Sequence, residues 1–316
     1  MRPDLISISI GRGSVYAEDE QGMTNNTEFF KLAEEYFWGR NRKQDFEEAI
    51  KLYRRIAEQG HDGAQYRIGL CYELGYGVVQ NYSEAEQWYS MAAANGNAEA
   101  QSCLASMYFE GKGIPQNYAE ALKWYRMAAE QGHTSAQNTL GNIYYLGDGV
   151  TQDFKEAAKW FCKAAEQGDV IGQFNLAMTY SEIIDGIVKV SEATEWFRKA
   201  AEQGEPKAQY KLGEAYSIGL GVARDFVKAA KWFRKAAEQG HPGAQFTLGA
   251  FYDEGKGVIQ DYIQAHMWLN LSSAGSIREG QEHAATRRDA VAKKMTRQQI
   301  AEAQRLARRW EPKKAE

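Results

Sequence analysis

Proline and cysteine are scarce in this chain, and long apolar runs are missing. The 316 residues include 5 prolines and 3 cysteines, and so few prolines exclude a proline-rich disordered chain and a collagen-like chain. No apolar run approaches the roughly 20 residues that a membrane-spanning helix needs, so we expect no membrane span. The cysteines Cys71, Cys103 and Cys162 have no Cys-x-x-Cys spacing. This pattern favours buried thiols over a disulfide framework or a thiolate metal site.

Sequence motifs of catalysis are missing as well. The chain contains no His-Glu-x-x-His motif, no Walker-type loop, no Gly-x-Ser-x-Gly elbow and no Ser-x-x-Lys motif. His61, His133 and His241 each follow a repeated glycine, which favours a role at helix junctions. His266 and His283 have no companion at the spacing of metal ligands. We therefore expect a protein that is not an enzyme and that uses no small-molecule substrate, cofactor or metal.

A repeat of 36 residues dominates what the sequence does contain. The segment Ala-Glu-Gln-Gly, or a close variant of it, ends at six glycines that are 36 residues apart: Gly60, Gly96, Gly132, Gly168, Gly204 and Gly240. Tyrosines, glutamines and tryptophans recur at the same interval, beginning at Tyr36, Gln65 and Trp88. Self-similarity at a fixed period predicts a solenoid, in which each unit buries its apolar face against its neighbours.

Each unit is predicted to contain two helices. In the first helix, Ala100, Leu104 and Tyr108 lie on one stripe. The second helix follows an N-cap residue and a glutamate three positions later, a pattern in which the glutamate reaches back to the cap. The pairs are Asp45 and Glu48, Asn81 and Glu84, Asn117 and Glu120, and Asp153 and Glu156. The tryptophan of the second helix, for example Trp124, stands among alanines and is predicted to lie in the core.

A Gly-x-Gly pair separates the two helices in five units: Gly75 and Gly77, Gly111 and Gly113, Gly147 and Gly149, Gly219 and Gly221, and Gly255 and Gly257. Because each pair follows a helix and no strand precedes it, the pattern predicts a tight turn with positive φ rather than a phosphate-binding loop. In the fifth unit, Ile183 and Asp185 replace the glycines and Lys189 replaces the N-cap. We expect an atypical turn at residues 181–190.

Residues 28–310 resemble the Sel-one-like repeat (SLR) family, a branch of the tetratricopeptide-like α-solenoids. The segments that carry the resemblance are AEALKWYRMAAEQG, GAQFTLGAFYDEGKGVIQDY and, similar to the closing helix of bacterial members, MTRQQIAEAQRLARRW. The resemblance implies an all-α, right-handed solenoid of seven helix pairs plus a capping pair, from a bacterium. It also implies protein–protein contacts of the kind that relatives make in signalling, envelope assembly and host interaction.

The expected organisation has three parts. Residues 1–26 form a disordered leader or a degenerate signal segment, residues 27–275 hold the seven repeats, and residues 276–316 hold capping helices and a basic tail. The stretch from Leu5 to Ile10 resembles the apolar part of an export signal, but Arg12 interrupts it. The compartment therefore stays open: the cytoplasm is favoured, and the periplasm or the exterior follows if residues 1–17 are cleaved.

Charge is unevenly distributed along the chain. Residues 276–316 carry 11 Lys and Arg against 6 Asp and Glu, whereas the whole chain has a net charge of −4. Thr296 and Gln299 form a capping-box pattern there. We interpret the cations as the solvated face of a capping helix, and we do not expect nucleic acid as a partner.

A helical wheel predicts the partner-binding surface. The repeated positions of the first helices cover one face, and the variable positions lie opposite. The resemblance to tetratricopeptide-like solenoids places the variable residues in the concave groove: Tyr66, Leu70, Glu73, Phe109, Asn138, Asn142, Tyr145, Phe174, Met178, Tyr210, Glu214, Phe246 and Asp253. Exposed aromatics among polar residues suit a peptide or a partner helix. The acidic residues favour a basic partner.

The predicted function is therefore a non-enzymatic scaffold or adaptor that binds a protein or peptide in this groove. One alternative is an exported binding protein of the same fold, directed at the envelope or the host. A further alternative is a hydrolase of the β-lactamase type, because some cysteine-rich relatives have been described as β-lactamases. Those relatives carry regularly spaced cysteine pairs that are missing here, so the resemblance does not carry that activity over.

Overall fold

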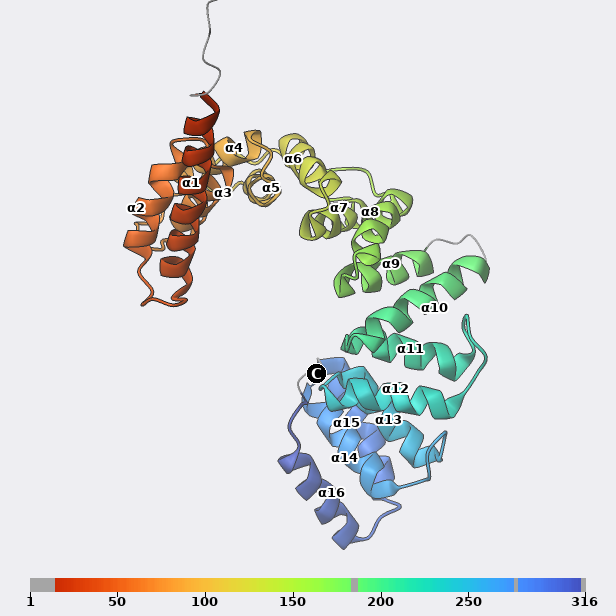
Figure 1. Cartoon of the computed structure of the whole chain (residues 1–316). Helices are drawn as coiled ribbons and strands as arrows, with labels where there is room; N and C mark the ends of the chain where they lie inside the picture. The colour runs from red at the N-terminus through yellow and green to blue at the C-terminus, as the bar shows by residue number, and fades with distance from the viewer. Residues whose placement is uncertain (1–14, 183–186, 276–277, 314–316) are drawn as a thin grey trace, which may run out of the picture. The chain divides into compact units, whose positions relative to one another are not determined.

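The computed structural model describes residues 15–182, 187–275 and 278–313, and all regular secondary structure in these ranges is α-helical. The chain forms two compact units, Met1–Gln137 and Asn138–Glu316. The first unit contains α1 (Val15–Trp38), α2 (Phe46–Ala57), α3 (Asp62–Leu74), α4 (Tyr82–Ala94), α5 (Ala98–Glu110), α6 (Tyr118–Glu130) and the start of α7 (Thr134–Leu146). Figure 1 shows these helices in red to yellow.

The second unit contains the rest of α7 and nine further helices. They are α8 (Phe154–Glu166), α9 (Val170–Glu182), α10 (Ile187–Glu202), α11 (Pro206–Ile218), α12 (Phe226–Glu238), α13 (Pro242–Glu254), α14 (Tyr262–Gly275), α15 (Arg278–Ala292) and α16 (Arg297–Arg309). Most helices that follow each other in the chain pack side by side, as α11 to α14 do in Figure 1, and α16 packs on α14. The predicted all-α repeat solenoid is confirmed.

The predicted N-caps begin the second helices. Asn117 Oδ1 accepts hydrogen bonds from the backbone N–H groups of Ala119 (3.1 Å) and Glu120 (3.2 Å), and Asp45, Asn81 and Asp153 cap their helices in the same way. The prediction that the glutamates reach back is corrected at Glu48, Glu120 and Glu156, which pair with the lysine three residues later: Lys51, Lys123 and Lys159. Each of these glutamates therefore contacts the next turn of its helix and not the N-cap residue, because the lysine ammonium there carries a full positive charge. The reciprocal capping box is present at Thr296 and Gln299.

The turn glycines have the predicted positive φ, from 65° at Gly257 to 80° at Gly147. The second glycine of the turn also allows a close approach. A Cβ at Gly113 would lie 2.2 Å from the Cβ of Tyr82, and a Cβ at Gly257 would meet the backbone oxygen of Phe226. The turn is therefore packed on the second helix of the preceding repeat. In the first repeat, Asn41 takes the place of the second glycine with φ 61°, because asparagine tolerates this region better than other side chains.

The repeated glutamines form a buried ladder that the sequence pattern did not explain. Each one donates through Nε2 to the backbone oxygen of the alanine eight residues earlier; they are Gln65, Gln101, Gln137, Gln173, Gln209 and Gln245. Each alanine belongs to the preceding repeat, and several of the glutamines also accept a hydrogen bond from the end of their own repeat: Gln239 Nε2 donates to Gln209 Oε1 at 2.9 Å. The ladder satisfies the buried amides and joins consecutive repeats.

The core of each repeat consists of alanines, a leucine or isoleucine of the first helix such as Leu104, and one large side chain of the second helix. The large residue is the one after the tryptophan: Tyr89, Phe161 and Phe233 are at most 1% exposed. The prediction of a tryptophan core holds at Trp160 and Trp268, which are 5% and 6% exposed. Four further tryptophans are half-buried and pack against the core from its edge: Trp88, Trp124, Trp196 and Trp232.

Helix geometry explains this difference. The residue after the tryptophan aligns with the alanines four before and three after it, which face the first helix, whereas the tryptophan is turned by about 100° to the edge of this stripe. At that edge its ring meets a lysine. The ammonium of Lys199 lies 3.6 Å from the ring centre of Trp196, and that of Lys235 lies 4.3 Å from the ring centre of Trp232.

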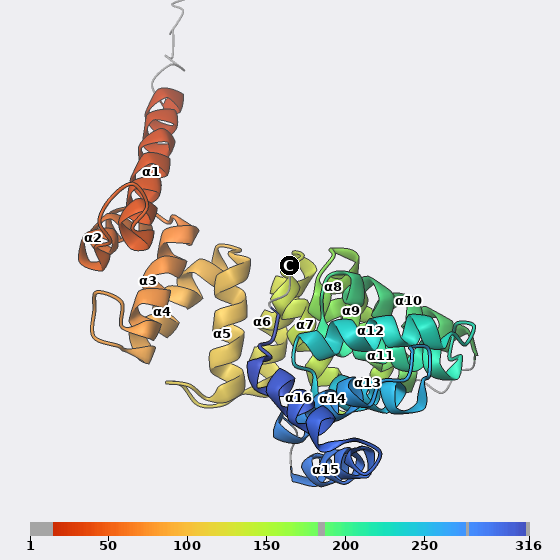
Figure 2. The same cartoon turned by 90° about the horizontal axis from the view of Figure 1, so that it is seen from below.

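Two segments differ from the regular repeat. Helix α1 begins at Val15, within the segment 1–26 for which the sequence indicated a disordered leader or a degenerate signal segment, and Figure 2 shows its first part extending past α2 and α3. Residues 1–14 lie outside the described residues. The atypical turn predicted at 181–190 falls partly outside them too, at residues 183–186. Helix α10 starts at Ile187 and has 16 residues, whereas its neighbours α9 and α11 have 13.

Candidate functional site

The thirteen predicted groove residues lie on the first helices of the repeats, α3 and α5 in the first unit and α7, α9, α11 and α13 in the second. Asn142 is exposed and Asn138 is buried, and the other eleven are half-buried. Most of these residues therefore offer only part of their surface to a partner, and their assignment to a binding groove stays a prediction. A helical wheel shows on which side of its own helix a residue lies, but it does not show which residues a neighbouring helix covers.

The residues at the first variable position of each helix pack inside their own repeat. The ring of Tyr66 lies 5.9 Å from that of Tyr89, and the Tyr210 ring lies 5.7 Å from that of Phe233 and stacks on His241. Phe174 lies 5.9 Å from Phe197 in the same way. These side chains hold the two helices of a repeat together and present only part of their surface.

Most of the acidic residues that suggested a basic partner already have partners. Glu73 accepts hydrogen bonds from Lys112 Nζ (2.9 Å) and from the hydroxyl of Tyr89 (2.7 Å). Glu214 pairs with Lys211 at 2.9 Å. Glu73 is thus paired within the fold, whereas the pair of Glu214 is an exposed contact on its own helix. The preference for a basic partner stays a prediction.

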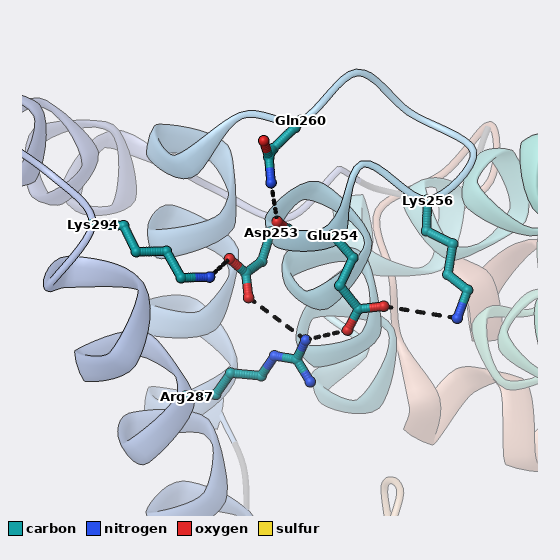
Figure 3. A network of polar contacts seen from close by, with 6 residues as sticks. All are labelled: Asp253, Glu254, Lys256, Gln260, Arg287 and Lys294. Carbon is teal, nitrogen blue, oxygen red and sulfur yellow. Dashed lines mark hydrogen bonds and ion pairs between the residues drawn. The ribbon is translucent and has the colours of Figure 1, made fainter.

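Asp253 is covered by the C-terminal cap. Its carboxylate accepts from Lys294 Nζ at 2.6 Å and lies 3.7 Å from an Arg287 nitrogen, and Arg287 also pairs with Glu254 (Figure 3). The Asp253 side chain is 12% exposed. Lys294 is exposed, as a solvated face predicts, and Arg287 is half-buried. Both cations also bind Asp253, which holds the cap on α13.

Four of the predicted residues do come together, around a pocket of about 180 Å³ in the second unit. We call it the Phe174 pocket; its lining residues are Asn142, Tyr145, Phe161, Phe174, Asn175 and Met178. Phe161 is 1% exposed, which places this wall in the core. Aromatic and thioether surface is thus combined with two amide groups.

A second hollow of about 520 Å³ shares Met178 with this pocket. It lies between α9, α10 and α11 and is lined by Glu182, Glu214 and Lys211 together with the exposed apolar residues Ile218 and Leu220, among others. We call it the Glu214 hollow. The two cavities follow one another along the first-helix face of the second unit.

Burial also affects the tyrosines of this face. Burial, with Glu214 close by, raises the pKa of Tyr210 to about 12. Burial raises the pKa of Tyr145 as well, and the charge of Glu182 adds to this. Both tyrosines are therefore neutral hydroxyl groups over the physiological range, able to donate and accept hydrogen bonds.

The wheel analysis missed two residues of the Phe174 pocket. Asn175 lies at a further variable position, occupied in other repeats by Arg67, Cys103 and Lys211, so variability alone could have identified it. Phe161 is the core residue after a tryptophan and varies little in character between repeats. Only the three-dimensional arrangement shows that it lines the pocket.

The histidines after the repeat glycines are helix caps, as predicted. Nδ1 of His61, His133 and His241 accepts from the backbone N–H three residues later, at 3.1 to 3.2 Å. In the described ranges, no three His, Cys, Asp or Glu side chains are grouped so that they could hold a metal ion. No helix in the described part of the chain is both long and apolar enough to cross a membrane.

The helix pairs, turn glycines and glutamine ladder define an all-α repeat solenoid. The model of the Sel1 repeat family matches seven consecutive segments of this solenoid: residues 30–61, 63–97, 98–133, 134–169, 170–205, 206–241 and 242–276. The chain belongs to the Sel1 repeat family, which confirms the resemblance found in the sequence. This fold is typically a non-catalytic scaffold for protein interaction.

Solved structures of bacterial proteins are similar to this chain. A Sel1 repeat protein from Oxalobacter formigenes is 31% identical, with a TM-score of 0.63, and the match covers 77% of this chain and 96% of that one. The c5321 protein of uropathogenic Escherichia coli, a protective antigen with an SLR fold, is 32% identical, with a TM-score of 0.40, over 90% of this chain and 76% of that one. A comparison with curated proteins gave no match.

Proposed function

We propose that this protein is a non-enzymatic scaffold that binds a peptide or partner helix on the first-helix face of its second unit. The observation that carries the proposal is the Phe174 pocket, in which four of the predicted groove residues meet. Its volume of about 180 Å³ suits one large apolar side chain, since apolar cavities of about 150 Å³ hold a molecule the size of benzene.

The chemistry of the pocket supports a peptide rather than a small polar substrate. Phe161, Phe174 and Met178 offer apolar surface to an anchoring side chain, and the amides of Asn142 and Asn175 can donate to and accept from a peptide backbone. The Glu214 hollow continues from Met178 and offers the next residues of the partner a surface of mixed polarity. A single anchor beside a wider polar surface is typical of peptide recognition.

The test is affinity capture with mass spectrometry from the native host, with the wild type beside two variants. Met178→Lys places a charge where the two cavities meet, and Ile171→Lys makes the same change on α9 at a residue that is 59% exposed and lines neither cavity. We expect partners that the wild type and the Ile171 variant recover and that the Met178 variant loses. Identical partners for all three chains would refute the proposal, provided that their circular dichroism spectra agree.

The non-enzymatic part of the proposal has its own test. The purified wild type is incubated with a chromogenic β-lactam, because a hydrolase of that type is the alternative that the family resemblance raises. We expect no turnover above the rate without protein. Turnover that follows the protein through purification would refute the scaffold-only function.

A further inference from the structure

A hollow of about 730 Å³ lies on the second-helix side of the second unit, away from the residues of the Phe174 pocket. It is an open depression bordered by α12 and by the turn that leads from α13 to α14, and its lining includes Lys231, Arg234, Tyr252 and Gln264. We call it the Lys231 hollow. Nothing in the proposed groove function uses this surface.

The two cations of the Lys231 hollow have no carboxylate partner among the described residues. Arg234 donates from Nη2 to the hydroxyl of Tyr252 at 2.7 Å, which holds the guanidinium in place. Asp261 lines the same hollow, but its Oδ1 accepts from the backbone N–H groups of Ile263 (2.9 Å) and Gln264 (3.0 Å) at the start of α14. The hollow therefore contains two positive charges and one carboxylate that is engaged with the backbone.

Comparison with other repeats shows which carboxylates are replaced here. In α8, Lys159 pairs with Glu156 three residues earlier, at 2.7 Å. The residue at the place of Glu156 is Lys228 in α12 and Gln264 in α14. Lys231 therefore has no glutamate three residues before it, and none stands at the matching place in the following second helix.

Arg234 has lost a partner in the same way. Its counterpart in α10 is Arg198, which donates to both carboxylate oxygens of Glu195 at 2.6 Å and lies 3.4 Å from the hydroxyl of Tyr216. The place of Glu195 is taken by Lys231 in α12. The tyrosine contact is thus kept in the Lys231 hollow, whereas the carboxylate is replaced by a second cation.

Apolar side chains lie beside these cations. Val227 and Ile259 both line the hollow and are 53% and 90% exposed. Exposed aliphatic surface gains free energy when a partner covers it, and a guanidinium binds a carboxylate with two parallel hydrogen bonds. The hollow therefore matches an occupant that carries a carboxylate next to an aliphatic side chain.

We propose that the Lys231 hollow docks an acidic peptide segment of a protein partner. A carboxylate of the segment lies between Lys231 and Arg234, and an adjacent aliphatic side chain covers Val227 and Ile259. The segment takes the place of the glutamates that the other repeats supply from their own sequence. This surface is separate from the Phe174 pocket, so either site can fail its test without affecting the other.

The experiment selects a phage-displayed library of random 12-residue peptides on the immobilised full chain. Three variants are compared with the wild type: Gln264→Glu, which restores the carboxylate of other repeats; Lys231→Glu, which reverses one cation; and Lys159→Glu, the matched charge reversal in α8. Enriched peptides are synthesised with a fluorescent label, and their binding is measured by fluorescence polarisation at low and high salt. Circular dichroism checks that all variants fold.

We expect enriched peptides with Asp or Glu next to Leu, Ile or Val. Their affinity should fall at least tenfold in Gln264→Glu and in Lys231→Glu, should stay unchanged in Lys159→Glu and should weaken with salt. The proposal is overturned if no enriched peptide depends on Lys231, or if peptides that do depend on it are not acidic. A labelled DNA duplex that binds through Lys231 while no peptide does would also overturn it, in favour of nucleic acid.

Discussion

Replacing Gln209 by leucine should destabilise the protein by about 2 kcal/mol. The Gln209 side chain is 4% exposed and makes two hydrogen bonds. Its Nε2 donates to the backbone oxygen of Ala201 (3.2 Å), and its Oε1 accepts from Gln239 Nε2 (2.9 Å). Leucine has a similar volume, so little cavity forms. The Ala201 oxygen keeps a bond from Gly204 N–H at 3.1 Å and is not left unpaired. Two lost bonds at about 1 kcal/mol each give the estimate.

The assay is urea unfolding of the full chain, followed by circular dichroism at 222 nm. Gln304→Leu is the control, since Gln304 is exposed on α16, and we expect it to stay within about 0.5 kcal/mol of the wild type. If Gln209→Leu is as stable as this control, the ladder does not hold the repeats together and the reasoning fails.

A second variant separates hydrogen bonding from packing. Gln209→Glu keeps the shape of the side chain, but an ionised carboxylate cannot donate to the Ala201 oxygen and is buried without a cation. We expect it to be less stable than Gln209→Leu at pH 7. Burial raises the pKa of such a carboxyl, so the difference from the wild type should shrink as the pH falls to 5, where the protonated group regains a donor.

Further predictions concern the core, a helix cap and the terminal cap. Tyr125→Ala should lower the free energy of unfolding by about 3–5 kcal/mol, because Tyr125 is 5% exposed. Trp124→Ala should lower it by less, because Trp124 is half-buried, and urea unfolding measures both variants. Burial lowers the pKa of His241 from its usual value. The neutral imidazole, which caps α13, therefore stabilises the fold above about pH 6.5, and this contribution is lost as the pH falls through the lower pKa of the folded state. His241→Asn should flatten this part of the pH dependence of stability. Asp253→Asn should weaken the cap by about 1 kcal/mol, which speeds amide hydrogen exchange in α15 about fivefold.

The local features of the fold could be predicted because they depend on neighbours in the sequence. Asn117 caps a helix that starts one residue later, and His241 caps the backbone N–H three residues away. Both follow from the N-terminal backbone groups that every helix leaves unpaired. The turn glycines could be predicted because the turn needs residues with positive φ, which glycine adopts most easily. The 36-residue spacing then shows that most units share these features, and so it predicts the solenoid.

Contacts between elements could not be predicted in the same way. The wheel placed Tyr66 and Tyr210 on a free face, and each of them packs on the second helix of its own repeat. It placed Asp253 in the groove, and the cap beyond α14 covers it with Arg287 and Lys294. A single-helix pattern carries no information about a neighbour 30 or 40 residues away. The candidate site was therefore predicted at the level of positions, and the structure decides which positions meet.

The repeat itself suggests where the chain differs from a plain scaffold. Contacts made by the ladder and the turns recur in most repeats, so they stabilise the solenoid without distinguishing one of these repeats from another. Binding needs a local difference, because a partner must recognise one place along a nearly uniform surface. In the last repeats that difference is the neutral Gln264 and the cationic Lys228, both at the place where other second helices carry glutamate. Positions that break the charge pattern but keep the packing pattern are thus the ones at which to look for partners in a chain of this kind.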